Sequence, residues 1–487
     1  MRTDAQFVLL WTDALLFALL AVALWAAWHA RADEALRAAW LKVGQRPVGM
    51  VAAVLLSSFV LIGLVDSVHY RPLLPPVAEA GNAEAEGAEG AGAAVYSTEV
   101  LSALDALLES LRLQTEKTYS APFARVLYQR ETIELADGSQ WRGFPPLQYG
   151  GAHLGASVTD DGGEQGQAAD IARRVTEALA LAAAGWLGLV GVLLAALRAA
   201  SGESWRATSA RLWRGQTRLA WRSVLLTAGV VLALLALGVQ LAPFYHVFGT
   251  DKVGQDVLYL ALKSVRTALI IGSITTLVML PVALVLGIAA GYLGGWVDDV
   301  VQYIYTVLNA IPGVLLIAAA VLMMQVLIDT HPQWFDTAAQ RSDARLLALC
   351  FILGITSWTG LARLLRGETL KLRELEYVQA ARAFGVGTPA ILRRHIMPNL
   401  MHIVLIALVM DFSGLVLAEA VLSYVGIGVD PTTISFGTMI NMARAELARE
   451  PMVWWSLSAA FVFMFVLVLA ANLFADVVRD AFDPRQS

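Results

Sequence analysis

The stretch that decides the fold is residues 376–398, which read EYVQAARAFGVGTPAILRRHIMP. Its alanine-rich start predicts a helix that ends at Gly385, and the turn-forming residues 387–389 predict the start of a second helix. We expect Pro398 to stop this second helix at the membrane surface. The stretch lies between two long apolar segments. It therefore predicts a helix-turn-helix loop between two membrane spans.

One face of the first predicted helix carries small side chains. Ala380 and Ala381 lie about one helical turn before Gly385. Residues without large side chains let the backbone of a partner approach closely. We therefore expect this loop to dock another protein.

The rest of the chain is strongly apolar. Of its 487 residues, 57% are hydrophobic and only 15% are charged, which excludes an ordinary soluble enzyme. A helix that crosses a bilayer needs about 20 mostly apolar residues, because lipid offers no partner to an unpaired backbone group. Nine windows meet this requirement, at 6–28, 48–66, 177–197, 223–243, 267–290, 301–328, 346–366, 402–425 and 453–476. The fold class is therefore an all-α membrane protein.

Lysines and arginines indicate how these windows cross the membrane. With the C-terminus in the cytoplasm, the inside segments hold 19 of them and the short outside segments hold 8. Positive residues favour the cytoplasmic side, so we expect the N-terminus outside and the C-terminus inside. The first window lacks a basic start and a cleavage site, so we expect it to remain as a span. Gly291 to Val300 is expected to form a tight cytoplasmic turn.

Residues 69–174 form a long predicted loop outside the membrane. Its Ala/Glu/Gly stretch at 77–94 predicts a tether. Leucines at helical spacing from Leu101 to Leu111 predict a helix, and the pattern around Asp137-Gly138 predicts a hairpin. Two interpretations of the loop stay open: a small extracytoplasmic subdomain and a solvated insertion without a partner.

A second segment outside the spans, residues 198–222, is basic. Six arginines alternate there with Trp205, Trp213 and Trp221. Basic residues with aromatic anchors favour the anionic inner leaflet, with the rings at headgroup depth. We therefore expect an interfacial helix that contacts membrane lipid. Nucleic acid is not expected as a partner, because the net charge is −5 and the membrane holds both ends of the segment.

The sequence carries no catalytic signature that we recognise. It contains neither a G-x-x-x-x-G-K-[ST] motif nor an H-E-x-x-H motif. His395 and His402 are two helical turns apart, but Pro398 lies between them and no carboxylate is near, so we expect no metal site. The single cysteine, Cys350, lies in an apolar run and is expected to be buried. We therefore expect no catalytic residue, bound cofactor or metal in this chain.

Four segments carry a resemblance to a known family. Residues 376–398 resemble the EAA loop of bacterial ABC importer permeases, although Gln379 stands where the general pattern has Glu. Residues 248–258, FGTDKVGQDVL, are similar to an outer segment of the C-type permeases of dipeptide and oligopeptide importers, with Gln255 for the usual Arg. Residues 418–429, AEAVLSYVGIGV, and 479–485, RDAFDPR, resemble two further segments of these permeases. The resemblance covers 245–487, about half of the chain.

This resemblance implies the transmembrane domain of a type I ABC importer, with a six-helix core preceded by about three extra transmembrane helices and an extracytoplasmic insertion. It implies a place in the bacterial cytoplasmic (inner) membrane. The implied partners are a second permease in a heterodimer, two ABC ATPases and an extracytoplasmic solute-binding protein. ATP and Mg would bind to the ATPases, which would hydrolyse the ATP, so this chain would be a transport subunit and not an enzyme.

The resemblance also implies roles for individual residues. The ATPase-coupling loop would use Glu376, Gln379, Ala380, Ala381, Arg382, Gly385 and Pro398. The outer segment would position the binding protein through Gly249, Thr250, Asp251, Gly254 and Asp256, and a plain Asx-type turn is the alternative.

The sequence suggests roles for two carboxylates and four glycines in or beside the spans. Glu419 is expected to line the translocation path or the permease interface with Ser423, and a purely structural hydrogen bond is the alternative. Asp411 is expected to form a hydrogen bond inside the bundle. The glycines either let helices slide or pack them closely, and they are Gly287, Gly291, Gly294 and Gly354.

These expectations divide the chain into six parts. They are two extra transmembrane helices (1–68), the extracytoplasmic loop or subdomain (69–174), a third extra helix with the basic interfacial helix (175–222), the first core helix with the outer segment (223–264), the type-1 permease core (265–478) with its coupling loop at 371–399, and a cytoplasmic tail (479–487).

The expected function is that of a peptide permease forming half of the translocation path. The same kind of importer acting on nickel or another small solute is an alternative, because the binding protein carries most of the selectivity. A stand-alone carrier or a polytopic membrane enzyme is the alternative from a different class.

Overall fold

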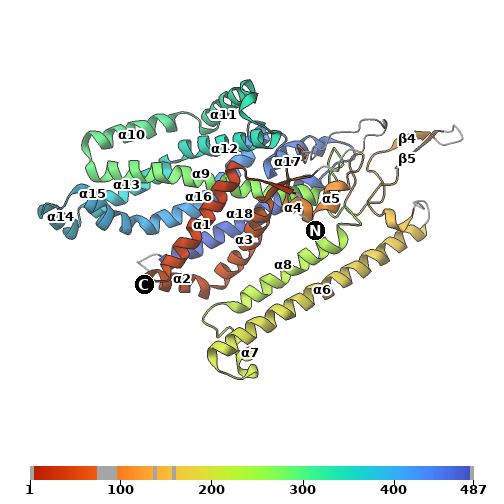
Figure 1. Ribbon diagram of the computed structural model, residues 1–487, viewed down its shortest axis with the longest axis horizontal. Coiled ribbons are helices and arrows are strands. Elements are labelled where there is room, and N and C mark those ends of the chain that lie inside the picture. Colours follow the sequence, from red (N-terminus) through yellow and green to blue (C-terminus); the bar gives the residue numbers. More distant parts are fainter. Residues whose placement is uncertain (1–4, 74–95, 135–139, 156–160, 483–487) are drawn as a thin grey trace, which may run out of the picture.

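The computed structural model describes residues 5–73, 96–134, 140–155 and 161–482. Nine helical segments of this described part are long and apolar enough to cross a membrane, which confirms the predicted number. They are α1 (Trp11–Ala30), α3 (Pro47–Asp66), α6 (Asp161–Ser201), α8 (Trp221–Leu241), α9 (Val257–Leu293), α11 (Gly313–Thr330), α12 with α13 (Ala338–Ser357 and Thr359–Arg373), α16 (Met397–Val425) and α18 (Trp455–Phe482). Figure 1 shows the α6–α8 hairpin standing beside the other helices.

The sixth span differs from the predicted window at 301–328. The helix is interrupted before Pro312, whose missing N–H and fixed φ favour a break there. This break separates α10 (Gly295–Ala310) from α11. The turn expected from Gly291 to Val300 is also shorter, because α9 continues to Leu293 and the chain turns at Gly294 with a φ of +67°. The third extra span is longer than predicted, since α6 begins inside the segment assigned to the outer loop.

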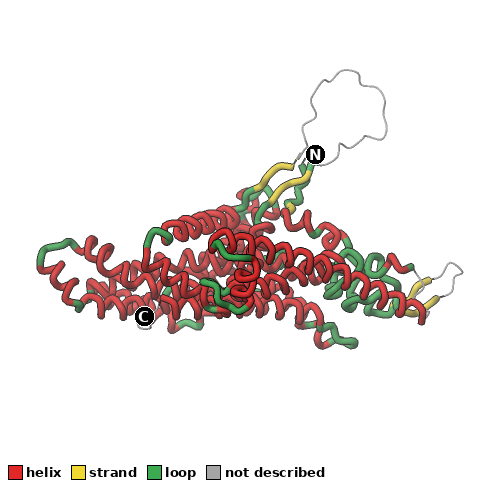
Figure 2. Tube along the Cα trace, turned by 90° about the horizontal axis from the view of Figure 1, so that it is seen from below, coloured by secondary structure: helices red, strands yellow, loops and turns green. Residues whose placement is uncertain are grey.

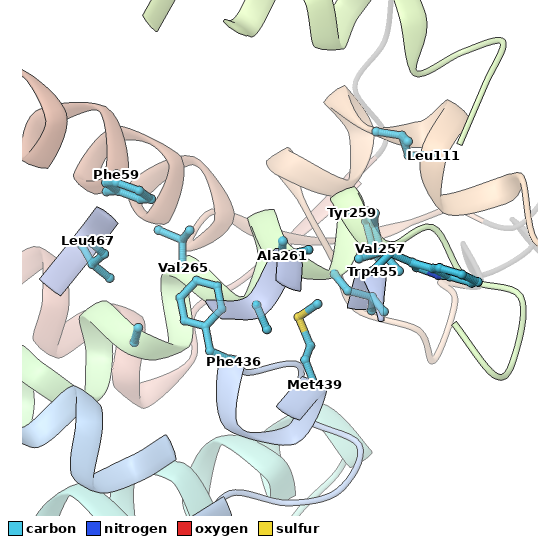
Figure 3. Packing of buried hydrophobic residues seen from close by; sticks show 14 of the residues in the cluster. Phe59, Leu111, Val257, Tyr259, Ala261, Val265, Phe436, Met439, Trp455 and Leu467 are labelled. Atoms are coloured by element: carbon cyan, nitrogen blue, oxygen red, sulfur yellow. The ribbon is translucent and has the colours of Figure 1, made fainter. Parts of the chain in front are cut away.

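Helix α9 lies at the centre of the bundle and packs against α3, α12, α13 and α16. Its outer half contributes buried side chains to the largest apolar cluster, which Figure 3 shows in close-up. Other members come from α3, from α17 (Phe436–Arg444) and from α18, among them Phe59, Phe436, Met439, Trp455 and Leu467.

Three of the four predicted glycines lie at close helix crossings. A Cβ on Gly287 would lie 2.7 Å from the carbonyl oxygen of Ala362, and one on Gly291 would lie 2.7 Å from that of Arg366. Gly354 of α12 approaches α9 in the same way. These glycines therefore let α9 contact α12 and α13 backbone to backbone, whereas Gly294 serves the turn.

Buried ion pairs join α9 to the N-terminal helices. Lys263 Nζ lies 2.7 Å from Asp66 Oδ1 of α3 and 3.0 Å from Asp105 Oδ1. One turn further along, a guanidinium nitrogen of Arg266 lies 2.5 Å from Asp13 Oδ1 of α1. The extra N-terminal helices are therefore fixed to the bundle by charge as well as by apolar packing.

The outer region contains two small antiparallel sheets, which Figure 2 shows at the edge of a helical body. The first pairs β1 (Ala5–Val8) with β2 (His69–Pro72), and β2 with β3 (Leu101–Ser102). The second pairs β4 (Glu131–Glu134) with β5 (Gln140–Gly143), Glu131 opposite Gly143, which confirms the predicted hairpin. The Asp137-Gly138 turn of this hairpin and the tether predicted at 77–94 lie outside the described residues.

The prediction of one helix from the leucine spacing of the outer loop is wrong. The chain forms β3 and two short helices instead, α4 (Ala103–Leu107) and α5 (Glu109–Leu113). The Ser102 hydroxyl caps the backbone N–H of Asp105, and the Asp105 carboxylate accepts from the N–H of Ser102. This capping box fixes the start of α4 at a point that leucine spacing alone does not show.

Short helices lie between the spans on the side of the C-terminus. They are α2 (Glu34–Gln45), α7 (Trp205–Trp213), α14 (Glu376–Ala383) and α15 (Thr388–Ile391). Helix α7 falls inside the basic segment, where a short helix was predicted. Figure 1 places α14 and α15 at one end of the long axis and the β4–β5 hairpin at the other.

Candidate functional site

The predicted docking loop forms α14, and its local geometry follows from the sequence. The helix ends at Ala383, and Gly385 follows two residues later with a φ of +78° and donates its N–H to the carbonyl oxygen of Arg382. The next residue, Val386, donates back to the carbonyl of Ala381 at 3.0 Å. Glycine reaches this left-handed conformation without the steric cost of a Cβ, so the predicted end of the helix is confirmed.

Two faces of α14 differ sharply in exposure. Val378 is buried and packs with Ile391, Ile396 and Leu400, and Ala381 is half-buried against the same cluster. The other predicted coupling residues are exposed, namely Glu376, Gln379, Ala380, Arg382 and Gly385. The loop is therefore held to the bundle on one side and presents small and polar groups on the other.

Phe384 is a residue of this loop that the sequence analysis missed. Its side chain is 87% exposed at the end of α14, directly before Gly385. A large apolar side chain in this position favours contact with another protein. The signal in the sequence is a phenylalanine directly before the glycine that follows the helix.

The expectation that Pro398 stops the second helix is wrong. Helix α15 continues through a π-helical turn, Leu392–Ile396, into α16, and Pro398 lies in the first turn of α16. The wider π-helical turn directly before Pro398 lets the continuous helix accommodate the proline. The Asn399 side chain then donates to the Tyr377 hydroxyl at 3.1 Å, which ties α14 to α16.

Glu419 forms the centre of a buried polar cluster near the C-terminal end of α16. Its Oε1 atom accepts hydrogen bonds from Ser423 at 2.7 Å and from Ser435 at 2.9 Å. Ser435 also caps α17 by accepting from the N–H of Thr438. A Cβ on Gly437 would lie 2.9 Å from Glu419 Oε1, so the carboxylate is tightly enclosed. This geometry favours the structural alternative for Glu419.

Asp411 behaves differently from the prediction. It is half-buried, and no hydrogen bond or ion pair joins it to another described residue, so the expected bond inside the bundle is wrong. The reason is its position on α16, because Leu408 and Gly414, three residues before and after it, are exposed. Leu415, four residues after Asp411, is buried, so Asp411 lies at the edge of the exposed face of the helix.

The outer segment is a buried junction and not a free surface. The Asp251 carboxylate accepts from the backbone N–H groups of Val253 and Gln255, each at 2.9 Å, which is the Asx-type turn of the alternative interpretation. Thr250 donates to the carbonyl of Thr118 and accepts from the N–H of Ser120. Residues 116–120 of the outer loop therefore cover this segment.

Gly249 and Gly254 allow this close cover. They have φ values of +68° and +81°. A Cβ on Gly249 would lie 2.4 Å from the carbonyl oxygen of Ser120, and one on Gly254 would lie 1.8 Å from that of Glu116. The outer loop is thus docked on the bundle by these backbone contacts, which favours a subdomain over a loose insertion.

A charged triad lies at the same junction. His246 Nδ1 lies 2.8 Å from Asp256 Oδ2, and its Nε2 lies 3.4 Å from Glu116 Oε1. Asp256 also caps α9 by accepting from the N–H groups of Leu258 and Tyr259. Burial alone would lower the pKa of His246, but the two carboxylates raise that pKa to about 9. The triad therefore carries a buried imidazolium near neutral pH.

Replacing Gly254 by alanine is expected to loosen the outer loop. The new Cβ would overlap the Glu116 carbonyl, and the positive φ adds about 1–2 kcal/mol of strain. We expect faster cleavage within 114–155 in limited proteolysis of the purified protein and a lower melting temperature. The matched control is Gly155→Ala, since Gly155 has a φ of +82° but no atom within 4 Å of its Cβ position. Equal effects of both variants would contradict the docking role of Gly254.

The triad predicts a pH dependence of stability. Because the folded pKa of His246, about 9, exceeds its ordinary value of 6.5, its stabilisation is complete below about pH 6.5 and is lost as pH rises towards 9. The melting temperature of the wild type is therefore expected to fall over this range. His246→Gln should be less stable at pH 6.5 and should show a flatter profile. Parallel profiles for the two proteins would refute this role.

The described residues show no group of three or more His, Cys, Asp or Glu side chains placed to hold a metal ion. Cys350 is free and fully buried, as predicted. Nine apolar spans, a bundle of closely crossing helices and an exposed helical loop at one end define, in the described part of the chain, a multi-pass membrane protein.

Comparison with known proteins identifies a family within this class of membrane proteins. Residues 283–487 match the family described as "Binding-protein-dependent transport system inner membrane component". The chain is 31% identical over 239 residues to the oligopeptide transport system permease protein OppC of Mycobacterium tuberculosis, covering 49% of this chain and 76% of that protein. It is 33% identical over 240 residues to the glutathione transport system permease protein GsiD of Pectobacterium atrosepticum, covering 49% and 73%.

A solved structure of the MetNI methionine ABC transporter matches with 17% identity and a TM-score of 0.36, covering 46% of this chain and 97% of that one. On the sequence relatives and the matched residues, the chain belongs to the family of binding-protein-dependent transport system inner membrane components. It is a multi-pass inner-membrane permease subunit of the ABC importer class, and its relatives are transport components, so the predicted class and fold are confirmed.

Proposed function

We propose that this chain forms half of a translocation path for peptides across the bacterial cytoplasmic membrane. The observation that carries the proposal is the exposed α14 loop, which is anchored by Val378 and ends in the exposed Phe384. The relatives support the substrate class, because they are named as oligopeptide, dipeptide and glutathione permeases. Nickel or another small solute is the alternative cargo.

Two separate ATPase subunits, carrying ATP and Mg, are proposed to bind the α14 loop. Ala380 and Gly385 leave room for the backbone of a partner, and Phe384 offers an apolar anchor. Val378 and the bond between Asn399 and Tyr377 connect the loop to α16. A movement of the ATPases would therefore be transmitted to the spans as a movement of a packed element.

A second permease is proposed to cover the outward face of α16. Asp411, at the edge of this face, has no partner among the described residues, and a carboxylate inside a membrane needs water or a polar partner. The same helix exposes Leu417, Val421 and Tyr424 at helical spacing. A second permease would bury this apolar stripe and supply the water-filled path or polar group that Asp411 requires.

The proposed orientation places the outer loop and the N-terminus outside and the C-terminus in the cytoplasm. A solute-binding protein would then meet the outer face of the molecule. In the outer segment, Lys252 and Val253 are exposed at the tip of the turn, whereas Gly254 and Asp256 are buried. The binding protein would therefore contact this tip and the subdomain beside it.

Reconstitution tests the proposal. The chain is expressed with the permease, ATPase and binding-protein genes adjacent to its own gene, and the purified complex is placed in liposomes. We expect a labelled dipeptide to accumulate only with ATP and the binding protein. Uptake of nickel but not peptide would establish the alternative cargo. Transport without nucleotide, or purification without any ATPase or second permease, would contradict the proposal.

A further inference from the structure

An apolar crevice opens between three helices outside the matched part of the chain. It has a volume of about 490 Å³ and lies between α3, α6 and α8. All the residues that line it are apolar, and they include Val54, Gly185, Leu189, Val192, Ala228 and Val231. Leu189 and Val192 are also exposed, so the crevice is open at the surface of the spans. Chemically, it suits an acyl chain.

The cytoplasmic ends of the same helices carry an excess of positive charge. Residues 198–222 contain six arginines and a single acid, Glu203, which pairs with Arg211. Arg206, Arg214 and Arg218 are exposed, and no ion pair joins them to an acid in the described ranges. These guanidinium groups are therefore available to an anion.

Aromatic side chains accompany these arginines. Trp205 and Trp213 are 48% and 40% exposed, and the Arg198 guanidinium lies 4.7 Å from the centre of the Trp205 ring. Half-exposed indole rings beside arginines are typical of the headgroup layer of a membrane.

The spacing between crevice and arginines fits one lipid molecule. Arg198 follows Val192 by six residues on α6, and Arg222 precedes Ala228 by six residues on α8. At 1.5 Å per residue, each separation is about 9 Å along the helix. A phospholipid can therefore place an acyl chain in the crevice while its phosphate lies among the guanidinium groups.

We propose that α6, α7 and α8, together with α3, form a binding site for one anionic phospholipid of the inner leaflet. The acyl chain fills the crevice, and exposed arginines of 198–222 bind the phosphate, to which guanidinium groups donate paired hydrogen bonds. An anionic headgroup is favoured over a zwitterionic one, because the segment holds one acid against six bases. The proposal shares the orientation given above but needs neither an ATPase nor transport.

Native mass spectrometry of the purified full chain tests the site. The probes are phosphatidylglycerol, phosphatidylcholine with the same acyl chains, and inorganic phosphate. We expect one tightly bound phosphatidylglycerol per chain and at least tenfold weaker binding of phosphatidylcholine. Replacing Arg206, Arg214 and Arg218 together by Gln should weaken binding at least fivefold. Arg341→Gln, at an exposed arginine outside the segment, should change nothing.

The crevice is tested by a matched pair of glycines on α6. Gly185 lines the crevice and Gly188 does not, and neither has an atom within 4 Å of its Cβ position. Gly185→Leu should fill the crevice and weaken lipid binding at least fivefold, whereas Gly188→Leu should not.

Three outcomes would overturn the proposal. They are equal binding of both phospholipids, equal losses in Gly185→Leu and Gly188→Leu, and displacement of phosphatidylglycerol by millimolar inorganic phosphate, which would indicate a site for free anions. Because binding is measured on the isolated chain, failure here would leave the peptide-import proposal standing.

Discussion

Gly385→Trp is expected to reduce peptide uptake to background while the protein inserts normally into the membrane. Position 385 lies on the exposed side of the α14 loop, and no atom lies within 4 Å of the Cβ that a substitution would add. The bundle can therefore accommodate the indole, but a docked partner cannot. A clash of about 3 kcal/mol would lower the docked population roughly a hundredfold. Uptake in reconstituted liposomes and the amount of inserted protein are the two measurements.

Two controls separate bulk from backbone strain in this experiment. Gly385→Ala adds the strain of a side chain at a φ of +78° without the bulk, and it should keep most of the uptake. Gly202→Trp places the same bulky residue at another open glycine with a φ of +69°, outside the loop, and it should transport normally. Normal uptake by Gly385→Trp would contradict the proposal that this loop docks a partner.

Glu419→Met is expected to lower the free energy of unfolding by about 3 kcal/mol. The substitution leaves Ser423 and Ser435 without their shared acceptor at a buried site, and an unmade buried hydrogen bond costs about 1–3 kcal/mol. Methionine has nearly the length of glutamate, so the change is mainly one of polarity. The melting temperature in detergent measures the effect.

Glu419→Gln is the variant that distinguishes the two interpretations of this residue. Glutamine retains a carbonyl oxygen that can accept from both serines, so we expect near wild-type stability and uptake. A loss of uptake in Glu419→Gln at unchanged stability would show instead that the charge acts in the translocation path.

The spans and the docking helix could be predicted because their causes are local. Hydropathy over about 20 residues determines whether a helix can cross the membrane, and Gly385 terminates α14 through its own backbone conformation. The single span predicted at 301–328 is wrong because the helix is interrupted before Pro312. Averaging the hydropathy over an apolar run conceals a single break of this kind. The expectation for Pro398 is wrong because a π-helical turn directly before it accommodates the proline, and residue spacing does not show such a turn.

The remaining features depend on contacts between distant residues. Ser435 reaches Glu419 from 16 positions away, and Glu116 reaches His246 across 130 positions. No spacing rule joins such residues, so the sequence pointed to Ser423 beside Glu419 but not to these distant partners. The exposure of Asp411 and Phe384 likewise depends on tertiary packing, because the bundle covers one face of each helix and leaves another open.

Site-directed cross-linking tests the central claim most directly. Cys350 is fully buried, so Ala380→Cys would add a single exposed thiol on the face of α14 that we propose to dock. In the reconstituted complex, this thiol should cross-link to an ATPase subunit, whereas Gln216→Cys, at an exposed position between α7 and α8, should not. Absence of an ATPase cross-link from Ala380→Cys in an actively transporting complex would contradict the account.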